Sequence, residues 1–246
     1  MTVKDQKTRI LQWDGCLNAR DLGGYATEDG HETRWDRVIR SDNLIRLTDA
    51  GRQALIDHGV RRIVDLRLPR ELEQDPPPFR GHDIVDYHHV SFIDPEAEPG
   101  PSVETLADDY KRMLERYKPG VTSIMRAIAE APQDGAVLIH CHSGKDRTGI
   151  ISALLLRLAG VPIETAAEDY GLTTERLRPL DEEWLENGPN DRAWREQEYE
   201  RFMARAEVMQ EVIEDLEARY GSVEAYLLDA GVPAEDVDRL KARMLE

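Results

Sequence analysis

A short polar run near the middle of the chain combines one cysteine with two glycines, a lysine and an arginine. It reads His140-Cys141-His142-Ser143-Gly144-Lys145-Asp146-Arg147-Thr148-Gly149. Cys141 and Arg147 are six positions apart, with Gly144 between them. A guanidinium offers a planar fork of donors that matches two phosphate oxygens, and a cysteine thiolate is a strong nucleophile. This spacing therefore predicts a loop that holds a phosphoryl group and attacks its phosphorus.

The backbone around this run is expected to supply much of the anion site. The apolar segment 136–140 precedes it and the nearly all-apolar segment 148–159 follows, which predicts a buried strand, a loop and a buried helix. Free N–H groups at a helix start bind anions, and a loop curled around that end adds more. Gly144 permits a close approach that a side chain would block. In such a field the pKa of Cys141 is expected to fall from about 8.5 into the range of roughly 3.5–7.5.

Other chemistries fit the same residues less well. A lone cysteine in an apolar strand is commonly an inert core residue, but polar residues and an arginine follow Cys141. His140 and His142 beside it suggest zinc, yet Lys145 and Arg147 would repel a cation, and no second ligand cluster is evident. The run lacks the earlier glycine and the following Ser/Thr of a nucleotide phosphate loop, and no local motif supplies the base of a papain-like protease. We therefore predict neither a metal nor a cofactor.

The flanking sequence alternates between short strands and helices from about residue 10 to residue 160. Strands are predicted over residues 37–40, 60–67, 84–90 and 136–140. Helices are predicted after a Thr48 cap, from a Ser102 cap to a break at Pro119-Gly120, over 121–128 and over 148–159. Residues 75–83 contain three prolines and can form neither a helix nor a central strand. This alternation indicates an α/β domain.

The last third of the chain is predicted to be helical. Asp191 is expected to cap a long helix, and Ser222 and Pro233 to begin two short ones. The apolar stripe of the long helix comprises Phe202, Ala206, Met209, Ile213, Leu216 and Tyr220. Such a stripe packs on the domain or forms a dimer seam, and so few heptads favour packing.

Composition limits the partners and the compartment. The chain has 246 residues, 40% of them hydrophobic, which is enough for a folded core. A net charge of -17 argues against nucleic-acid binding and against stable attachment to anionic membranes. Cys16 and Cys141 form no disulfide framework, and no apolar run has signal-peptide or membrane-spanning length. We expect a cytoplasmic protein, and secretion without a signal peptide stays open.

The polar run resembles the phosphate loop of a known enzyme family. HCHSGKDRTG matches the C-x5-R-[ST] loop of cysteine-based protein phosphatases. Its Lys-Asp-Arg variant resembles the bacterial tyrosine/serine phosphatase family, which includes dual-specificity and phosphoinositide phosphatases. The resemblance extends over about residues 10–180 through NARDLGGY from Asn18, RSDNL from Arg40, VDLRLPREL from Val64 and DYGLTTERL from Asp169. Ser143 departs from the small apolar residue that is common there, but serine is also small. The end of the chain carries no motif of the family.

The resemblance implies a role for each residue of the loop. Cys141 would attack the phosphoryl group and form a phosphocysteine, while Arg147 and the loop N–H groups hold the equatorial oxygens. Thr148 would aid departure of the thiolate, or simply cap the helix. Lys145 would extend the positive field toward a second phosphate or an acidic neighbour, or be a solvated residue. The rest of the predicted substrate-binding set is His142, Ser143 and Gly144.

Two aspartates are candidates for the acid that protonates the leaving group. The Lys-Asp-Arg variant places an aspartate inside the loop, which implies Asp146, and the alternative is a structural carboxylate that counters its basic neighbours. Asp94 in SFIDPEAEP is the second candidate, or else a turn residue. Asp65 and His140 are expected to be structural. A buried polar turn that supports the loop is expected from Asn18, Arg20, Asp21, Gly23 and Gly24.

The resemblance also implies a fold and an activity. The fold is α/β of the cysteine-phosphatase type, with a mostly parallel central sheet flanked by helices and an all-helical C-terminal extension. We expect a phosphatase core over residues 1–170 and a helical extension over residues 171–246, together in one compact domain. The implied activity is metal-independent hydrolysis of phosphotyrosine, and also of phosphoserine/threonine, in phosphorylated proteins. The alternatives are a phosphoinositide phosphatase acting on a phospholipid headgroup, a rhodanese-like sulfurtransferase and an inactive phosphate-binding module.

Residues 171–205 have an unusual composition for a surface segment. Pro179, Gly188 and Pro189 are expected to break it into helical pieces. An otherwise acidic stretch here carries three large apolar groups, Trp184, Trp194 and Phe202. As in some members of the resembled family, these pieces are expected to form a lid over the pocket, and plain packing on the domain surface is the alternative.

Overall fold

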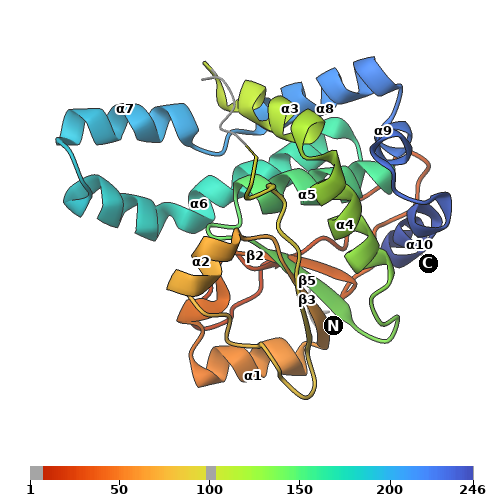
Figure 1. Cartoon of the computed structure of the whole chain (residues 1–246), viewed down its shortest axis with the longest axis horizontal. Helices are drawn as coiled ribbons and strands as arrows, with labels where there is room; N and C mark the ends of the chain where they lie inside the picture. The colour runs from red at the N-terminus through yellow and green to blue at the C-terminus, as the bar shows by residue number, and fades with distance from the viewer. Residues whose placement is uncertain (1–7, 98–103, 246) are drawn as a thin grey trace, which may run out of the picture.

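A five-stranded sheet lies at the centre of the molecule (Figure 1). The computed structural model describes residues 8–97 and 104–245. The strand order is β1-β2-β5-β3-β4, in which β1 pairs antiparallel with β2 and the other three pairs are parallel. The strands are β1 (Arg20–Asp21), β2 (Val38–Ser41), β3 (Val60–Asp65), β4 (Asp86–His89) and β5 (Ala136–His140). Because β2, β5 and β3 are parallel, the loops after them meet at one edge of the sheet.

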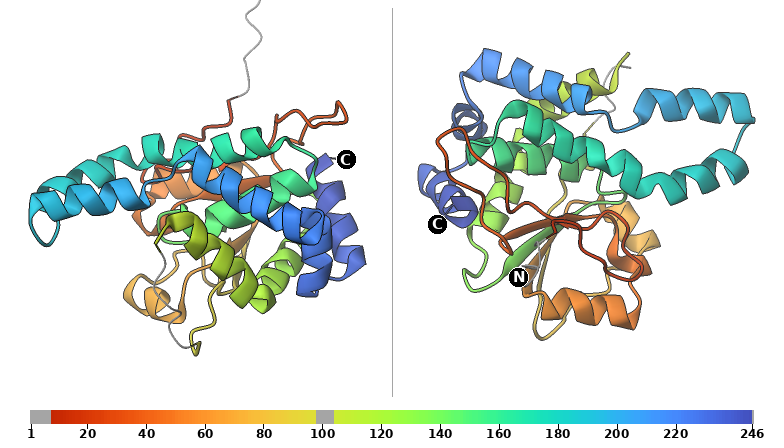
Figure 2. Two further views of the ribbon diagram at one scale, coloured as in Figure 1. Left: turned by 90° about the horizontal axis from the view of Figure 1, so that it is seen from above. Right: turned by 180° about the vertical axis from the view of Figure 1, so that it is seen from behind.

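Helices cover the two faces of the sheet unequally (Figures 1 and 2). One face packs against α1 (Asp49–Asp57). Near the edge of the sheet lie the short helices η1 (Leu44–Arg46) and α2 (Pro69–Gln74). The other helices are α3 (Leu106–Arg116), α4 (Lys118–Ala129), α5 (Asp146–Leu158), α6 (Ile163–Asn187), α7 (Arg192–Phe202), α8 (Ala206–Tyr220), α9 (Val223–Ala230) and α10 (Ala234–Leu245).

The central strand β5 shows how the sequence builds these layers. Val137 and Ile139 belong to the larger apolar cluster, whereas Ala136 and Leu138 belong to the smaller one on the α1 side. Successive side chains of a strand point to opposite faces, so one apolar run serves both layers. The larger cluster also contains residues of α8, α9 and α10. The C-terminal helices therefore share one core with the sheet.

The expected α/β fold with a mostly parallel sheet is confirmed, and its predicted strands are present within a few residues of their expected bounds. Neither β1 nor α2 is predicted by periodicity, because two residues and six residues are too short to show it. Ser102 lies outside the described residues. The helix there begins at Leu106, and Thr105 caps it by accepting a hydrogen bond from the Asp108 N–H.

The predicted break at Pro119-Gly120 lies two residues earlier in the structure, at Tyr117. Helix α3 ends at Arg116, and α4 begins at Lys118 with both residues in its first turn. Proline is tolerated there because the first N–H groups of a helix have no partner inside it. A side chain at Gly120 would meet the Phe92 carbonyl oxygen 2.2 Å from its Cβ, so the glycine serves close packing rather than a turn.

The prediction that Pro179 ends a helix is wrong. Helix α6 runs from Ile163 to Asn187 with Pro179 inside it. A proline removes the hydrogen bond to the carbonyl four residues earlier, here that of Glu175. Both residues are exposed, so that carbonyl faces water instead of being left unpaired in the core. Gly188 and Pro189 end the helix as predicted.

The long helix predicted after Asp191 is also wrong, although Asp191 does cap α7 by accepting a hydrogen bond from the Trp194 N–H. Residues 203–205 separate α7 from α8. The buried Ala204 accepts a hydrogen bond from the Thr174 side chain of α6, which fixes the turn between the two helices. In α8, Met209, Ile213 and Leu216 are buried within the single chain, which confirms packing rather than a dimer seam for that part of the stripe.

The outer half of α6 and the antiparallel α7 form a hairpin that projects from the body of the molecule (Figures 1 and 2). The buried Arg195 closes its turn by donating to the carbonyls of Leu185 and Gly188. We call this segment, residues 177–202, the helical hairpin. Among the residues that the structure describes, no helix is long and apolar enough to cross a membrane.

Candidate active site

The polar run forms the connection between β5 and α5, as its position in the sequence predicts. Strand β5 ends at His140, and α5 begins at Asp146. Cys141 comes directly after the strand and has only 1% of its surface exposed. The loop from Cys141 to Lys145 therefore joins the central strand to the start of a buried helix, where free N–H groups collect.

The rest of the fold holds the carbonyl groups of this loop from outside. The Asn43 N–H donates to the His142 carbonyl at 2.8 Å. The Asn18 amide donates to the carbonyls of Ser143 and Gly144 at 3.1 and 3.3 Å. Arg40 adds a third donor at 2.8 Å from the Gly144 carbonyl oxygen. With these carbonyls engaged outward, the N–H groups of His142, Ser143 and Gly144 have no acceptor among the described residues. The loop thus presents a concave row of donors, which is a nest for an anion.

Gly144 is required at its position for two reasons. Its φ is +68°, in the left-handed region that favours glycine. A Cβ there would also lie 2.3 Å from the Ser41 carbonyl oxygen at the end of β2. The loop therefore packs directly against the neighbouring strand, which fixes its curvature.

A buried ion cluster supports the outer side of the loop. Asp169 of α6 accepts hydrogen bonds from Arg20 at 2.9 Å, from Arg40 at 2.6 Å and from the Tyr25 hydroxyl at 3.0 Å. Burial raises the pKa of Asp169, but the two guanidiniums outweigh that effect and hold the pKa well below its ordinary value. Since Arg40 also binds the Gly144 carbonyl, this carboxylate sets the position of the phosphate loop through one intermediate residue.

Replacing Asp169 with asparagine is expected to destabilise the protein by about 3–5 kcal/mol, because two buried guanidiniums lose their counterion. The lowered pKa of Asp169 means that its contribution is fully present above the unfolded-state pKa of about 3.9 and is lost as the pH falls further toward the folded-state pKa. Urea unfolding of both proteins at pH 7 and pH 3.5 measures this. A difference in the free energy of unfolding between the two proteins below about 1 kcal/mol at pH 7 would contradict the assigned role. This difference should be smaller at pH 3.5 than at pH 7.

Arg147 is oriented by a carboxylate that the sequence does not single out. Glu71 of α2 accepts from Nη1 of Arg147 at 2.5 Å and from Nη2 at 2.9 Å. Burial lowers the pKa of Arg147, but the charges of Cys141 and Glu71 raise it above its ordinary value, which places the guanidinium in the field of the cysteine. Nε of Arg147 donates to no acceptor among the described residues. Nη2 carries two hydrogens, and only one of them is used by Glu71. Nε and the second Nη2 hydrogen thus remain for two oxygens of a phosphate.

Replacing Glu71 with glutamine is expected to lower kcat/KM for small phosphate esters by about 10- to 100-fold, because Arg147 loses the charged fork that holds its plane. The measurement is kcat and KM with p-nitrophenyl phosphate. Glu73→Gln on the same helix is a matched control, since Glu73 is exposed. Equal rates in the two variants would show that Glu71 does not position Arg147.

Asp146, the proposed acid, begins α5 beside the loop. Its Oδ1 accepts from the Tyr110 hydroxyl at 2.5 Å and from Lys145 Nζ at 2.7 Å. Burial raises the pKa of Asp146, but the Lys145 ammonium and these hydrogen bonds outweigh it and leave the pKa below its ordinary value. Oδ2 has no donor among the described residues. One oxygen is therefore held in place, and the other remains available for a proton.

Asp94, the second candidate, lies on an exposed loop after β4. Its side chain accepts a hydrogen bond from the Glu96 N–H, and its carbonyl accepts from the Ala97 N–H. This is the turn geometry that the sequence offered as the alternative. The structure thus brings Asp146 to the phosphate loop and places Asp94 in a turn of its own.

Asp65 and His140 hold the base of the site. Asp65 is fully buried and pairs with Arg67 at 2.7 Å and with the Tyr87 hydroxyl at 2.8 Å. His140 is buried, and its Nδ1 lies 3.0 Å from the Cys141 carbonyl oxygen, so Nδ1 carries the proton. Burial lowers the pKa of His140, which keeps the ring neutral near pH 7. Asp65 accepts from the Arg67 N–H, and His140 binds the Cys141 carbonyl. Both side chains thus hold the backbone, which fits the expected structural roles.

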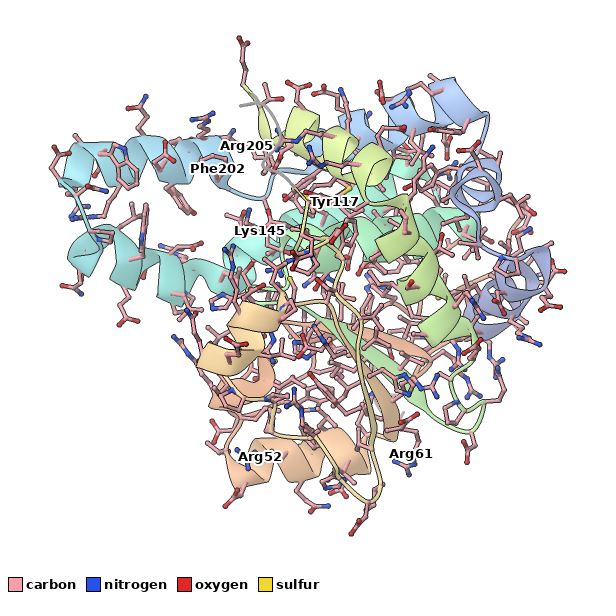
Figure 3. The ribbon with its side chains drawn as sticks, viewed as in Figure 1. Arg52, Arg61, Tyr117, Lys145, Phe202 and Arg205 are labelled. Atoms are coloured by element: carbon pink, nitrogen blue, oxygen red, sulfur yellow. The ribbon has the colours of Figure 1, made fainter. Side chains whose placement is uncertain are left out.

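The remaining loop residues differ in exposure. His142 is exposed at the mouth, whereas Thr148 is buried and its hydroxyl has no partner among the described residues. Lys145 binds Asp146 and also the Phe202 carbonyl at the end of α7, at 2.9 Å. Figure 3 labels Lys145 and Phe202 where the helical hairpin returns to the body. The lysine is therefore not a free solvated residue, because it joins the phosphate loop to that hairpin.

Within the part of the chain that the structure describes, one group of metal-type ligands lies on β1 and its surroundings. Asp21, Asp36 and His58 place ligand atoms within 4.8 Å of one another. His58 Nε2 lies 3.1 Å from Asp36 Oδ1, and Asp21 accepts hydrogen bonds from the N–H groups of Gly23 and Asp36. These contacts account for the cluster without an ion, and none of its members belongs to the phosphate loop.

Comparison with known proteins decides the family. The family model for the tyrosine phosphatase family matches residues 11–246, which include the whole loop and its supporting residues. The chain belongs to this family. It is 36% identical to a tyrosine-protein phosphatase of Nostoc commune, over 85% of this chain and 74% of that protein. It is 27% identical to the triple specificity protein phosphatase PtpB of Mycobacterium tuberculosis, over 96% of this chain and 99% of that protein.

The match corrects one limit of the sequence analysis. No motif is recognisable after about residue 180, yet the family model extends to residue 246. The C-terminal helices are therefore part of what this phosphatase shares with its family. Their sequences follow the need to pack on α3, α4 and α5, which constrains apolar positions but leaves no fixed run of polar residues.

Sequence reasoning missed several residues of this phosphatase site. Glu71 stands in the quoted segment VDLRLPREL, where an acidic residue just after a strand end is the signal that could have found it. Tyr110 reads as one more apolar position on α3, and only the structure shows its hydroxyl on Asp146. Asp181 of α6 lines a cavity with Ser143 and Lys145, and no local pattern marks it.

Proposed function

We propose that this phosphatase hydrolyses phosphomonoesters through a phosphocysteine, with phosphotyrosine in proteins as the principal substrate and phosphoserine/threonine as a further one. The observation that carries the proposal is the loop after β5. Its carbonyls are engaged outward, its N–H groups face inward, and Cys141 lies at its base beside the Arg147 guanidinium. A trigonal group of three oxygens fits such a ring of donors.

The chemistry follows from these positions. The loop N–H groups and the free side of the Arg147 fork bind the phosphoryl oxygens, and the Cys141 thiolate forms an S–P bond as the ester P–O bond breaks. The leaving oxygen takes a proton from Asp146 through Oδ2, the oxygen not held by Tyr110 and Lys145. Because the lowered pKa leaves this carboxyl ionised in the free enzyme at neutral pH, the proton is supplied when the ester binds as its monoanion. Water then attacks phosphorus, the S–P bond breaks, and Asp146 accepts the proton of that water. The Cys141 thiolate is regenerated, and inorganic phosphate is released.

Two observations favour a protein substrate over a phosphoinositide. Lys145, the residue that would reach a second phosphate, is engaged by Asp146 and by the Phe202 carbonyl. The net charge of -17 repels an anionic membrane surface.

The thiol chemistry requires reduced cysteine, and both Cys16 and Cys141 are free, so we place the enzyme in the cytoplasm.

The test compares substrates with one preparation of enzyme. We expect turnover of p-nitrophenyl phosphate in the presence of a chelator, and a kcat/KM for a phosphotyrosine peptide at least tenfold above that for a phosphoinositide headgroup. The reverse order would assign the site to phosphoinositides. A protein that turns over thiosulfate but no phosphate ester would be a sulfurtransferase. A protein with neither activity would be a phosphate-binding module.

We also propose that the helical hairpin acts as a lid over the loop mouth. Two observations support this. Lys145 of the phosphate loop binds the Phe202 carbonyl of the hairpin, and Ser143 of the loop lines a cavity together with hairpin residues. Bound vanadate is expected to slow amide hydrogen exchange in residues 177–202. Exchange there that is indifferent to vanadate would mean that the hairpin packs beside the site without covering it.

A further inference from the structure

A cavity of about 280 Å³ lies between the two helices of the hairpin and opens onto the phosphate loop. Ser143 and Lys145 form its inner end, whereas Cys141 and Arg147 are not part of its lining. The cavity therefore starts at the rim of the phosphate site and leads away from it. Figure 3 shows the labelled Lys145 and Phe202 at this junction, with the hairpin extending outward from them.

The cavity is longer than the ring of a phosphotyrosine. Its wall on α6 runs from Thr173 through Leu177 and Asp181 to Trp184, all on one face of the helix. At 1.5 Å per residue this wall is about 16 Å long. A phenyl ring covers about one helical turn, roughly 5.4 Å of that length. A ligand held by its phosphate in the loop thus needs further groups beyond the ring to fill the cavity.

The lining determines which groups fit. Trp184 and Trp194, with ring centroids 6.3 Å apart, and Phe202 supply large apolar surfaces. Asp181 and Glu198 supply negative charge, and among the described residues of the lining only Lys145 is basic. Asp181 is partly buried, so water screens its charge poorly, and a second carboxylate beside it would be repelled. An apolar group is favoured here, and an acidic one is opposed.

We infer that this cavity is a specificity subsite that binds an apolar side chain close in sequence to the phosphotyrosine of a protein substrate, and that it discriminates against acidic neighbours. The inference rests on the proposed phosphatase function. An extended peptide advances about 3.3 Å per residue, so the cavity reaches residues up to about three or four positions from the phosphotyrosine. A lipid acyl chain is also apolar, but the acidic residues of the cavity and the acidic surface oppose an anionic lipid.

The test uses phosphotyrosine peptides in an alanine background, with one leucine or one aspartate moved through the four positions on each side. We expect leucine at one or two adjacent positions to raise kcat/KM about tenfold over alanine, mainly through KM, and aspartate at the same positions to lower it. Phe202→Ala should reduce the leucine preference to about threefold or less. This variant keeps the backbone carbonyl that binds Lys145.

A matched control comes from the inner part of α6, outside the helical hairpin. Leu172 of α6 is 37% exposed, as is Phe202, and it does not line the cavity. Leu172→Ala should retain the full leucine preference. Asp181→Asn should relax the discrimination against aspartate. Both effects are taken relative to p-nitrophenyl phosphate, which does not reach the outer part of the cavity, so that general damage to the loop cancels.

The outcomes separate the subsite from the function on which it rests. No hydrolysis of p-nitrophenyl phosphate by the wild-type protein would overturn both. Normal hydrolysis with equal rates for all peptides would overturn the subsite alone. A preference that disappears in Leu172→Ala as well as in Phe202→Ala would also overturn it, because the effect would not be local. Acyl-chain-dependent hydrolysis of phosphoinositides, without peptide preference, would assign the cavity to lipid.

Discussion

Replacing Cys141 with serine is expected to abolish phosphomonoester turnover, by at least about 10⁴-fold, while the protein still binds phosphate-like oxyanions. A serine hydroxyl is a far weaker nucleophile than a thiolate at neutral pH. The groups that bind the anion are untouched, since the N–H groups of the loop and the Arg147 fork belong to other residues. Vanadate or tungstate binding by calorimetry, beside kcat with p-nitrophenyl phosphate, measures the two effects separately.

The second cysteine provides the control. Cys16 is buried and donates from its thiol to Asp42 at 2.8 Å, and a serine there keeps a donor of similar size. Cys16→Ser should keep kcat within about threefold of wild type. If Cys141→Ser retains activity within tenfold, the phosphocysteine mechanism is excluded. If it loses oxyanion binding too, the cysteine is needed to build the loop, and its role as nucleophile must be tested by trapping the intermediate.

Replacing Asp146 with asparagine is expected to slow hydrolysis of esters with poor leaving groups by about 10²–10⁴-fold. Phosphotyrosine and alkyl phosphates need a proton on the departing oxygen, whereas p-nitrophenolate departs readily without one. The loss for p-nitrophenyl phosphate should therefore be much smaller. The ratio of kcat/KM across leaving groups is the measurement, because a merely structural change at Asp146 would misplace Arg147 and depress all substrates alike.

The same variant has a predicted pH signature. A general acid must carry its proton when the ester is bound, so kcat for phosphotyrosine should fall as the pH rises through the pKa of Asp146 in the complex. Asp146→Asn should remove that fall. Asp94→Asn is the control, since Asp94 lies in an exposed turn. A steep leaving-group dependence in Asp94→Asn and a flat one in Asp146→Asn would transfer the acid to that loop.

The chemistry of the loop could be predicted because its residues are adjacent in sequence. Cys141, Gly144 and Arg147 lie within one strand-to-helix connection, whose backbone geometry is local. The partners of that connection are not local: Glu71 reaches Arg147 from α2, and Tyr110 reaches Asp146 from α3. A tyrosine on an apolar stripe reads as core, and nothing in its own segment indicates where its hydroxyl points. Only the packing of the helices on the sheet brings such pairs together.

The helix boundaries show where local rules fail. Pro179 and the stripe after Asp191 predict a break and a continuous helix respectively, and both predictions are wrong. The proline is tolerated because Pro179 and Glu175, whose carbonyl loses its helical donor, are both exposed residues. The stripe is interrupted because Ala204 is bound to Thr174 of α6. In both places tertiary surroundings outweigh a propensity of a few kcal/mol or less.

The proline inside α6 has a mechanical consequence. On one side of it, Asp169 and Thr173 bind Arg20, and Asp169 also binds Arg40, so that half of the helix is fixed to residues that hold the phosphate loop. On the other side the helix carries Asp181 and Trp184, which form the outer part of the cavity wall. Pro179 has no N–H to donate to the Glu175 carbonyl, so bending the helix there breaks fewer hydrogen bonds than bending it at other interior positions of α6. Helix α6 thus has an anchored half and an outer half that meet at Pro179, and the cavity wall spans the point where the helix bends most easily.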